Sequence, residues 1–151
     1  MSDPLDPTDC PFYLVSRASL AVTAMLKREL LAAGVTQVRP SYLAVLMCLW
    51  REEGLKVVEL GSRAGLEPST MTGLLDRMER DGLVERVADP ADRRAQRVHL
   101  TEHARTIREA AMSVVDKALR GVLGDVSENE LEQLKLLLRR ILANTERLVP
   151  A

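Results

Sequence analysis

Apolar residues recur at intervals of three and four along most of this chain, which is the spacing of a buried helix face. The pattern predicts helices at about residues 11–33, 40–53, 58–64, 68–81, 102–123 and 128–148. Gly34, Gly54 and Gly124 follow three of these segments, as residues at helix C-termini often do, and Pro40 suits the first turn of the second. Residues 1–9, with three acids and two prolines, are expected to form a loose arm.

The last two predicted helices begin with clear capping signals. Thr101 suits the N-cap of the fifth helix, and Ser127 with Glu130 fits a capping box for the sixth. The sixth helix carries an apolar stripe at Leu131, Leu134, Leu138, Ile141, Thr145 and Leu148. A terminal helix this apolar would expose much of its face if unpartnered, so we expect a seam shared with another copy; a place in the chain's own core is the alternative.

Between residues 83 and 100 the pattern changes from helical to extended. Two short β-rich segments, 83–87 and 97–100, flank the polar, turn-forming segment 88–96. This arrangement predicts a β-hairpin with a long basic tip.

The two short helices before the hairpin are joined by a tight turn at residues 65–68, which contains glycine and proline. Two short helices with such a turn are typical of a helix-turn-helix. The second helix would bury Met71, Leu74, Leu75 and Met78 and present its other face to solvent. The order of elements therefore predicts a mainly α-helical protein with a small β-hairpin wing: a winged helix-turn-helix flanked by helical arms.

Composition narrows the possible classes of protein. The chain has 151 residues, 46% of them hydrophobic, and a net charge of -1, which suits one folded domain rather than a disordered chain. No apolar run is long enough for a membrane span, and the acidic start lacks a signal segment, so we expect no membrane partner and a cytoplasmic location. The two cysteines form no metal-binding pattern, and nothing indicates a metal or a cofactor.

The charge is unevenly distributed, and this points to DNA. Five arginines and a single acid lie between residues 93 and 108. A helix fits the major groove, and its N-terminal N–H groups attract phosphate. The residues that we expect to contact DNA are Ser69, Thr70, Thr72 and Arg77 on the second short helix, and Arg93, Arg94 and Arg97 on the hairpin. The arginines at the hairpin tip suit the neighbouring minor groove.

These segments resemble a known family. Residues 92–101, with the sequence DRRAQRVHLT, are similar to the D-x-R…L-T wing signature of MarR-type transcriptional regulators. Residues 69–84 resemble the recognition helix and first wing strand of that family, and the likeness extends over about residues 10–148. By this resemblance Arg94 would be the wing-tip arginine, and Asp92 would anchor the wing through an intrachain pair.

The resemblance implies an obligate homodimer that binds double-stranded DNA at a palindromic operator. Residues 1–151 would form a single MarR-type chain, in which 10–38 and 102–148 supply the dimerisation helices and 39–101 the DNA-binding lobe. The implied function is a regulator, most simply a repressor, that an unknown small-molecule or oxidant effector releases from DNA.

Other interpretations remain open. The near-neutral charge also suits a winged-helix module that binds proteins and no DNA. The hydroxyls at 69, 70 and 72 could simply cap their helix, and Arg77 could pair with Asp76, Glu79 or Asp81. An enzyme is not expected, because the chain shows no nucleophile–base pair, no phosphate-cradling glycine loop and no metal-ligand spacing.

Cys10 is the one residue whose chemistry suggests a sensor. It lies at the predicted start of the first helix, where the helix field favours the thiolate, but Asp9 beside it has the opposite effect. Residues 10–14 and 41–50 resemble the organic-peroxide-sensing branch of the MarR family. Cys10 is therefore either a redox sensor or an incidental thiol, whereas Cys48 lies in an apolar helix and suits the core.

Overall fold

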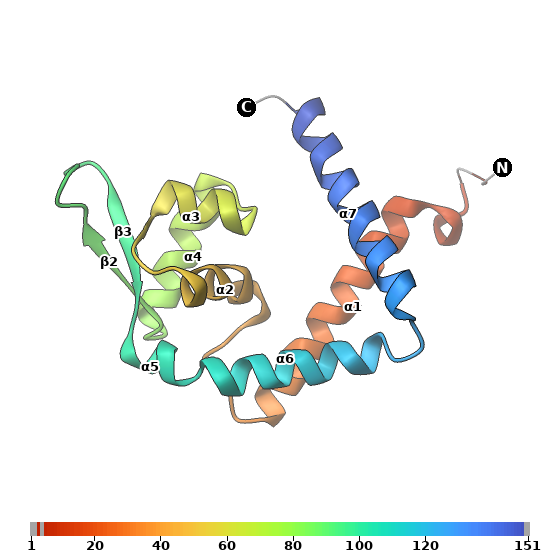
Figure 1. Ribbon diagram of the computed structural model, residues 1–151, viewed down its shortest axis with the longest axis horizontal. Coiled ribbons are helices and arrows are strands. Elements are labelled where there is room, and N and C mark those ends of the chain that lie inside the picture. The colour runs from red at the N-terminus through yellow and green to blue at the C-terminus, as the bar shows by residue number, and fades with distance from the viewer. Residues whose placement is uncertain (1–2, 4, 150–151) are drawn as a thin grey trace. The chain divides into compact units, whose positions relative to one another are not determined.

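The structure is a computed structural model that describes residue 3 and residues 5–149 of the chain (Figure 1). Its contacts divide the chain into two units, Met1–Ala118 and Leu119–Ala151, which are described separately below. Part of the predicted N-terminal arm, residues 1, 2 and 4, lies outside the described residues. Within the arm, η1 (Pro7–Asp9) is a short 3-10 turn capped by the Asp6 carboxylate, so these residues are more ordered than predicted.

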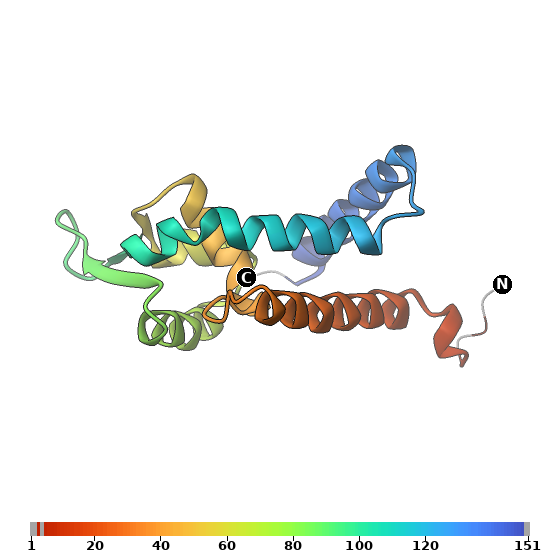
Figure 2. The ribbon, with the colours of Figure 1, turned by 90° about the horizontal axis from the view of Figure 1, so that it is seen from below.

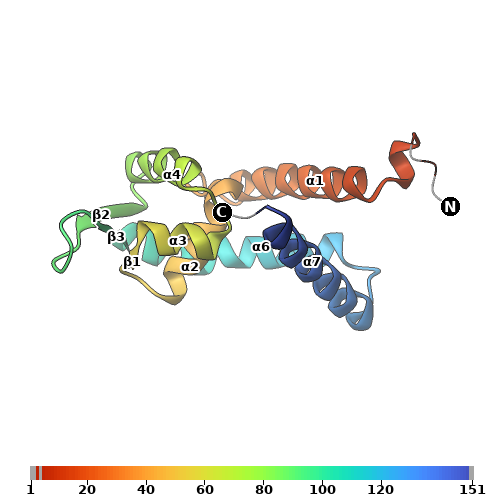
Figure 3. The same cartoon turned by 90° about the horizontal axis from the view of Figure 1, so that it is seen from above.

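The first unit contains a long helix, a helical lobe and a hairpin, as the pattern predicted. Its elements are α1 (Pro11–Ala32), η2 (Pro40–Tyr42), α2 (Leu43–Arg51), β1 (Leu55–Lys56), α3 (Val57–Ala64), α4 (Pro68–Arg80), β2 (Val84–Ala88), β3 (Gln96–Leu100), α5 (Glu102–Thr106) and most of α6 (Arg108–Val122). Figure 2 and Figure 3 show the hairpin extending from the lobe that holds α3 and α4. Gly65, between α3 and α4, takes φ +70°, a left-handed conformation that favours glycine and allows the sharp turn.

The core of this unit forms from the faces that periodicity predicted. Tyr42 and Leu46 are fully buried, as are Leu75 and Met78 of α4. The core also takes in the second half of α1, through Leu26 and Leu30, and the residues Ala111, Val115 and Ala118 of α6. The first half of α1 stays exposed, including its apolar residues Phe12, Leu14, Val15 and Leu20.

The wing belongs to a three-stranded antiparallel sheet with the strand order β1-β3-β2. Leu55 of β1 lies opposite Val98 of β3, and Val84 of β2 lies opposite Leu100. The sequence analysis missed β1, because two residues carry no measurable alternation.

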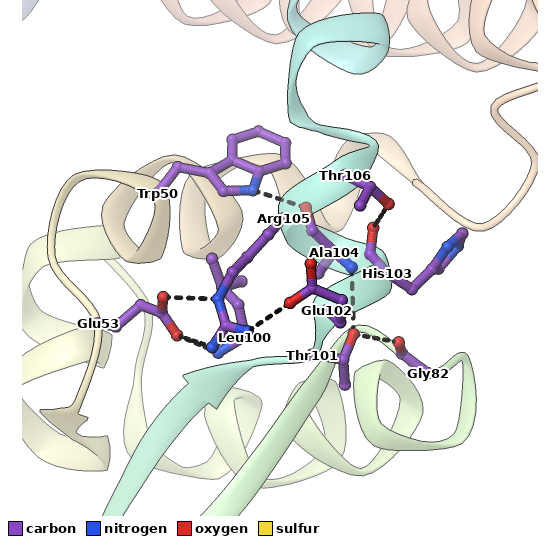
Figure 4. Close-up of polar contacts among 10 residues, drawn as sticks. All are labelled: Trp50, Glu53, Gly82, Leu100, Thr101, Glu102, His103, Ala104, Arg105 and Thr106. Atoms are coloured by element: carbon purple, nitrogen blue, oxygen red, sulfur yellow. Dashed lines mark hydrogen bonds and ion pairs between the residues drawn. The ribbon is translucent and has the colours of Figure 1, made fainter.

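The predicted helix over residues 102–123 is wrong in one respect: it breaks at Ile107 into α5 and α6. Trp50 packs beside the break, and its indole Nε1 donates a hydrogen bond of 3.0 Å to the Ala104 carbonyl oxygen (Figure 4). A helix carbonyl normally accepts from the N–H four residues later. At the break between α5 and α6, the Trp50 side chain donates to the Ala104 carbonyl in place of a backbone N–H.

The second unit consists of the end of α6 and the helix α7 (Glu128–Leu148). The capping box predicted from Ser127 and Glu130 is present, with both reciprocal hydrogen bonds formed. None of the described residues of α7 is buried, and Leu134, Ile141 and Leu148 are among its exposed apolar residues. No helix in residues 5–149 is long and apolar enough to cross a bilayer.

Candidate nucleic-acid interface

The first turn of α4 presents three hydroxyl side chains to solvent. Ser69, Thr70 and Thr72 are all exposed, and α4 starts with Glu67 as an N-cap that makes no side-chain hydrogen bond. Thr72 Oγ1 donates a weak bond of 3.3 Å to the Pro68 carbonyl, whereas the hydroxyls of Ser69 and Thr70 bond to nothing in the described chain. Helix capping therefore does not explain these residues, and their hydroxyls can reach an external partner.

Arg77 lies further along α4 and is also exposed. A Cβ built on Gly73 would lie 3.4 Å from Nη1 of Arg77, so the guanidinium extends back over the glycine towards the start of the helix. The alternative ion pairs of Arg77 with Asp76, Glu79 or Asp81 do not occur in residues 5–149. Each of these acids has another partner, which leaves Arg77 available.

Two of these acids bind Arg86 of β2 and thereby join α4 to the wing. The Arg86 guanidinium lies 2.8 Å from Glu79 and 2.5 Å from Asp76, and the Arg86 backbone N–H donates to Glu79 at 3.0 Å. The hydrogen bonds to Glu79 and then Asp76 raise the pKa of Arg86, while those from Arg86 lower the pKa of Glu79. This clamp was not predicted, because nothing in the local sequence pattern distinguishes Arg86 from other exposed arginines.

The third acid, Asp81, fixes the end of α4. The Tyr42 hydroxyl donates to Asp81 at 2.6 Å, and Arg39 lies 3.6 Å from the same carboxylate and 5.9 Å from the centre of the tyrosine ring. Burial raises the pKa of Tyr42, and the bond to the Asp81 carboxylate adds to this effect. The C-terminal half of α4 is therefore held in place by Arg86 and Tyr42, while the hydroxyls of its first turn remain exposed.

We expect Arg86→Met to lower the free energy of unfolding by about 1–3 kcal/mol, since it removes charge-assisted hydrogen bonds from a half-buried site. Arg80→Met on the same helix, where the arginine is exposed and has no salt bridge among the described residues, should change it little. Denaturant unfolding of both variants measures the difference. Equal stability of the two would show that the clamp contributes nothing.

At the tip of the wing, Arg93 and Arg94 are exposed and make no ion pair within residues 5–149. Asp92 holds this tip through a turn: its carboxylate accepts the Arg94 backbone N–H at 3.0 Å, and its own carbonyl accepts the Ala95 N–H at 3.0 Å. The anchoring contact is thus made to the backbone, where the sequence analysis expected an ion pair.

The buried anchor of the wing is Asp89, which the sequence analysis did not identify. Its side chain is 1% exposed; Arg97 Nε lies 3.1 Å away and Lys56 Nζ 3.7 Å away. Arg97 also donates to the Gly54 carbonyl at 2.6 Å. Although Arg97 was expected on DNA, the structure places its guanidinium at the base of the wing, where it joins β3 to the segment before β1.

The Ala91 backbone N–H, followed by the charges of Arg97 and Lys56, lowers the pKa of Asp89. A lowered folded-state pKa means that the ionised carboxylate stabilises the fold above the unfolded value near 4, and that this contribution is lost as the pH falls through the folded value. Asp89→Asn should therefore lower Tm at pH 7, by an amount that shrinks as the pH approaches 3. Thermal unfolding of both proteins across that range measures this, and a pH-independent difference would contradict the assignment.

A groove lies between α4 and the wing. It has a volume of about 260 Å³, and its lining includes Thr72 of α4 and Arg86, Arg94 and Gln96 of the hairpin. One predicted contact residue of α4, Thr72, and one of the wing tip, Arg94, therefore line the same groove.

The two cysteines lie in different surroundings. Cys10 is half-buried at the N-cap position of α1 and makes no side-chain capping bond. Cys48 is half-buried on α2 and packs against the core, as predicted. No group of His, Cys, Asp or Glu suited to a metal ion occurs among the described residues.

Comparison with known proteins agrees with this architecture. The family model described as "MarR family" matches residues 39–95. The organic hydroperoxide resistance transcriptional regulator of Bacillus subtilis is 33% identical over 130 residues, which cover 86% of this chain and 85% of that protein.

Solved structures show the same fold across nearly the whole chain. PcaV from Streptomyces coelicolor, solved in complex with its natural ligand, matches with a TM-score of 0.82 and 25% identity over 97% of this chain and 100% of PcaV. CouR from Rhodococcus jostii, solved with p-coumaroyl-CoA, matches with a TM-score of 0.76 and 26% identity over 91% of this chain and 94% of CouR. The Bacillus subtilis relative and PcaV are transcriptional regulators by name, which agrees with the prediction that the chain is not an enzyme. The chain belongs to the MarR family of transcriptional regulators.

Proposed function

We propose that this protein binds a palindromic operator as a homodimer and represses transcription until an effector releases it. The observation that carries the proposal is the groove between α4 and the wing, which is lined by Thr72 and by Arg94, an arginine with no partner in the described chain. Such an arrangement suits a DNA duplex: the helix enters the major groove and the wing reaches the minor groove beside it.

The residue roles follow from which groups are free. Ser69, Thr70 and Thr72 contact phosphate and base edges, since their small side chains let the helix approach closely. Arg77 binds a phosphate or a guanine edge, and Arg93 and Arg94 enter the minor groove. Asp92 and Arg97 position the wing through their intrachain contacts, with Asp89 as the buried centre.

A homodimer would cover the apolar faces that one chain leaves exposed. Those faces lie on the first half of α1 and along α7, within the dimerisation segments 10–38 and 102–148, while residues 39–101 form the DNA-binding lobe. Burial of such faces drives association. Two lobes spaced about 34–36 Å apart would then meet two half-sites one helical turn apart.

Release requires an effector that changes the spacing of the two lobes, because affinity falls when both half-sites cannot be met together. Two kinds of effector remain: a small molecule, as the ligands of CouR and PcaV suggest, or an oxidant, as the name of the Bacillus subtilis relative suggests. An oxidant would act through Cys10 at the start of α1.

The effector types are separated by treating operator complexes of the wild type and of Cys10→Ser with an organic hydroperoxide. If Cys10 is the sensor, only the wild type releases DNA, and Cys48→Ser behaves as the wild type. Equal release from the wild type and Cys10→Ser would remove Cys10 as the sensor, whereas no release from either would leave the small-molecule route.

The proposal as a whole is tested by recovering genomic fragments bound to the protein, sequencing them and searching the sequences for a shared palindrome. Binding to the recovered site should weaken as salt rises, because phosphate contacts release counterions. No salt-dependent duplex binding would instead favour the protein-interaction module that the net charge of -1 left open. A cytoplasmic location is part of this proposal, since the protein would meet operator DNA there.

A further inference from the structure

A second hollow lies at the other end of β3, away from the wing tip. It is open to solvent, has a volume of about 330 Å³ and is lined by residues from the end of α2, the end of β3, α5 and the start of α6. Four charged side chains line it: Arg51, Glu53, Arg105 and Arg108. The same corner, without Leu49, Arg51 and Arg108, is drawn in Figure 4. We refer to it as the Trp50 pocket, after the indole in its wall.

Only one of its three arginines is neutralised. Arg105 binds Glu53 through two nitrogens, with distances of 2.9 and 3.0 Å, and lies 3.2 Å from Glu102. Glu53 also accepts the Leu100 backbone N–H at 2.9 Å, and these bonds, that from Arg105 first, lower its pKa. The carboxylate of Glu53 is thereby fully engaged with groups already in place.

Arg51 and Arg108 have no counterion within residues 5–149. Both are exposed, and neither makes a salt bridge or a side-chain hydrogen bond there. The nearest acid in sequence to Arg51, Glu52, is bound to Arg63 at 2.6 Å. Arg108 is the first residue of α6, where the helix dipole adds positive potential. The pocket thus carries about two uncompensated positive charges.

One wall of the pocket is aromatic and held in place. The indole Nε1 of Trp50 is bonded to the Ala104 carbonyl, so the ring cannot turn freely. Leu49 and Leu100 add apolar surface beside it. A planar group can stack on such a wall while its charged end meets the guanidinium groups.

We propose that the Trp50 pocket binds a small ligand that carries a phosphate monoester beside a planar ring. A phosphate monoester has a charge of about -1.5 to -2 at pH 7, which matches two free guanidinium groups, whereas one carboxylate leaves a positive charge unmet. The site is separate from the α4–wing face, so its existence does not depend on the proposed operator.

The test uses the single tryptophan of the chain, which lies in the pocket wall. Phenyl phosphate should change its fluorescence saturably, and inorganic phosphate and benzoate should bind more weakly. The double variant Arg51→Gln/Arg108→Gln should raise the phenyl phosphate Kd by at least about tenfold, because each lost charge-assisted bond is worth about that much. Arg28→Gln on α1, outside the pocket, is the matched control and should leave Kd unchanged.

Three results would overturn the assignment: no saturable signal at millimolar phenyl phosphate, the same Kd in the double variant, or tighter binding of benzoate. A fourth is a loss of operator affinity in the double variant without any ligand, which would make these arginines DNA contacts. Because both arginines are exposed, the variants should unfold at the wild-type Tm. Failure of phenyl phosphate binding with intact operator binding would reject the pocket alone.

Discussion

Replacing Arg94 with alanine is expected to weaken operator binding by about 10–100-fold, the loss that follows from removing a charge-assisted hydrogen bond at a desolvated contact. The Arg94 guanidinium has no partner in the described chain. Arg94 and Thr72 of α4 line the same groove, so a duplex bound to α4 would lie within reach of Arg94. The plot of log affinity against log salt should also flatten by about one unit, since one fewer cation displaces counterions.

The matched control is Arg28→Ala, which removes an exposed arginine of α1 whose side chain is 75% exposed. It should leave both the affinity and the salt dependence unchanged. Arg97→Ala supplies a contrast, because its guanidinium binds Asp89 and the Gly54 carbonyl: it should lower Tm as well as affinity. Unchanged affinity and an unchanged salt slope for Arg94→Ala would count against the wing assignment.

The second large effect is expected from Ile141→Glu in the middle of the α7 stripe. Ile141 is half exposed in the single chain. The free-energy cost of burying a carboxylate in an apolar interface is much larger than the stabilisation that a surface ion pair could provide. The variant should sediment as a monomer or a weakened dimer. Operator binding should then fall by orders of magnitude, because the two half-sites are no longer joined in one molecule.

Ala143→Glu is the control for this experiment, since it places the same charge on the opposite face of the same helix. Analytical ultracentrifugation and operator binding should both match the wild type. If Ile141→Glu remained a dimer with full affinity, α7 would not be the shared seam. If both variants dissociated, association would involve the whole circumference of the helix.

The elements that the sequence predicted well are those whose signals are local. The buried face of α4 needs only the spacing of Met71, Leu74, Leu75 and Met78, and the capping box at Ser127 needs four consecutive residues. The hairpin boundaries differ by one residue at each strand, within the usual uncertainty of strand ends. Periodicity and caps describe a segment without reference to the rest of the chain.

The features that the sequence did not reveal depend on partners far apart in the chain. Trp50 bonds to Ala104 across 54 residues, and Arg97 bonds to the Gly54 carbonyl across 43. Asp89 was read as part of a polar turn, although the fold buries it between two cations. The neighbouring sequence gives no signal for these residues, because their contacts form only when distant segments of the chain come together in the fold.

By itself the sequence determined the class of the molecule: a mainly helical chain with a winged helix-turn-helix, a basic wing tip and apolar stripes on its terminal helix. Those properties follow from side-chain period and local charge, which the order of residues specifies directly. Only the tertiary structure decided which arginines form ion pairs within the chain and which do not. The reason is that folding determines which acidic side chains lie next to each guanidinium. On that basis Arg93 and Arg94 are available for the proposed contact with DNA, whereas Arg86, Arg97 and Arg105 hold the lobe together.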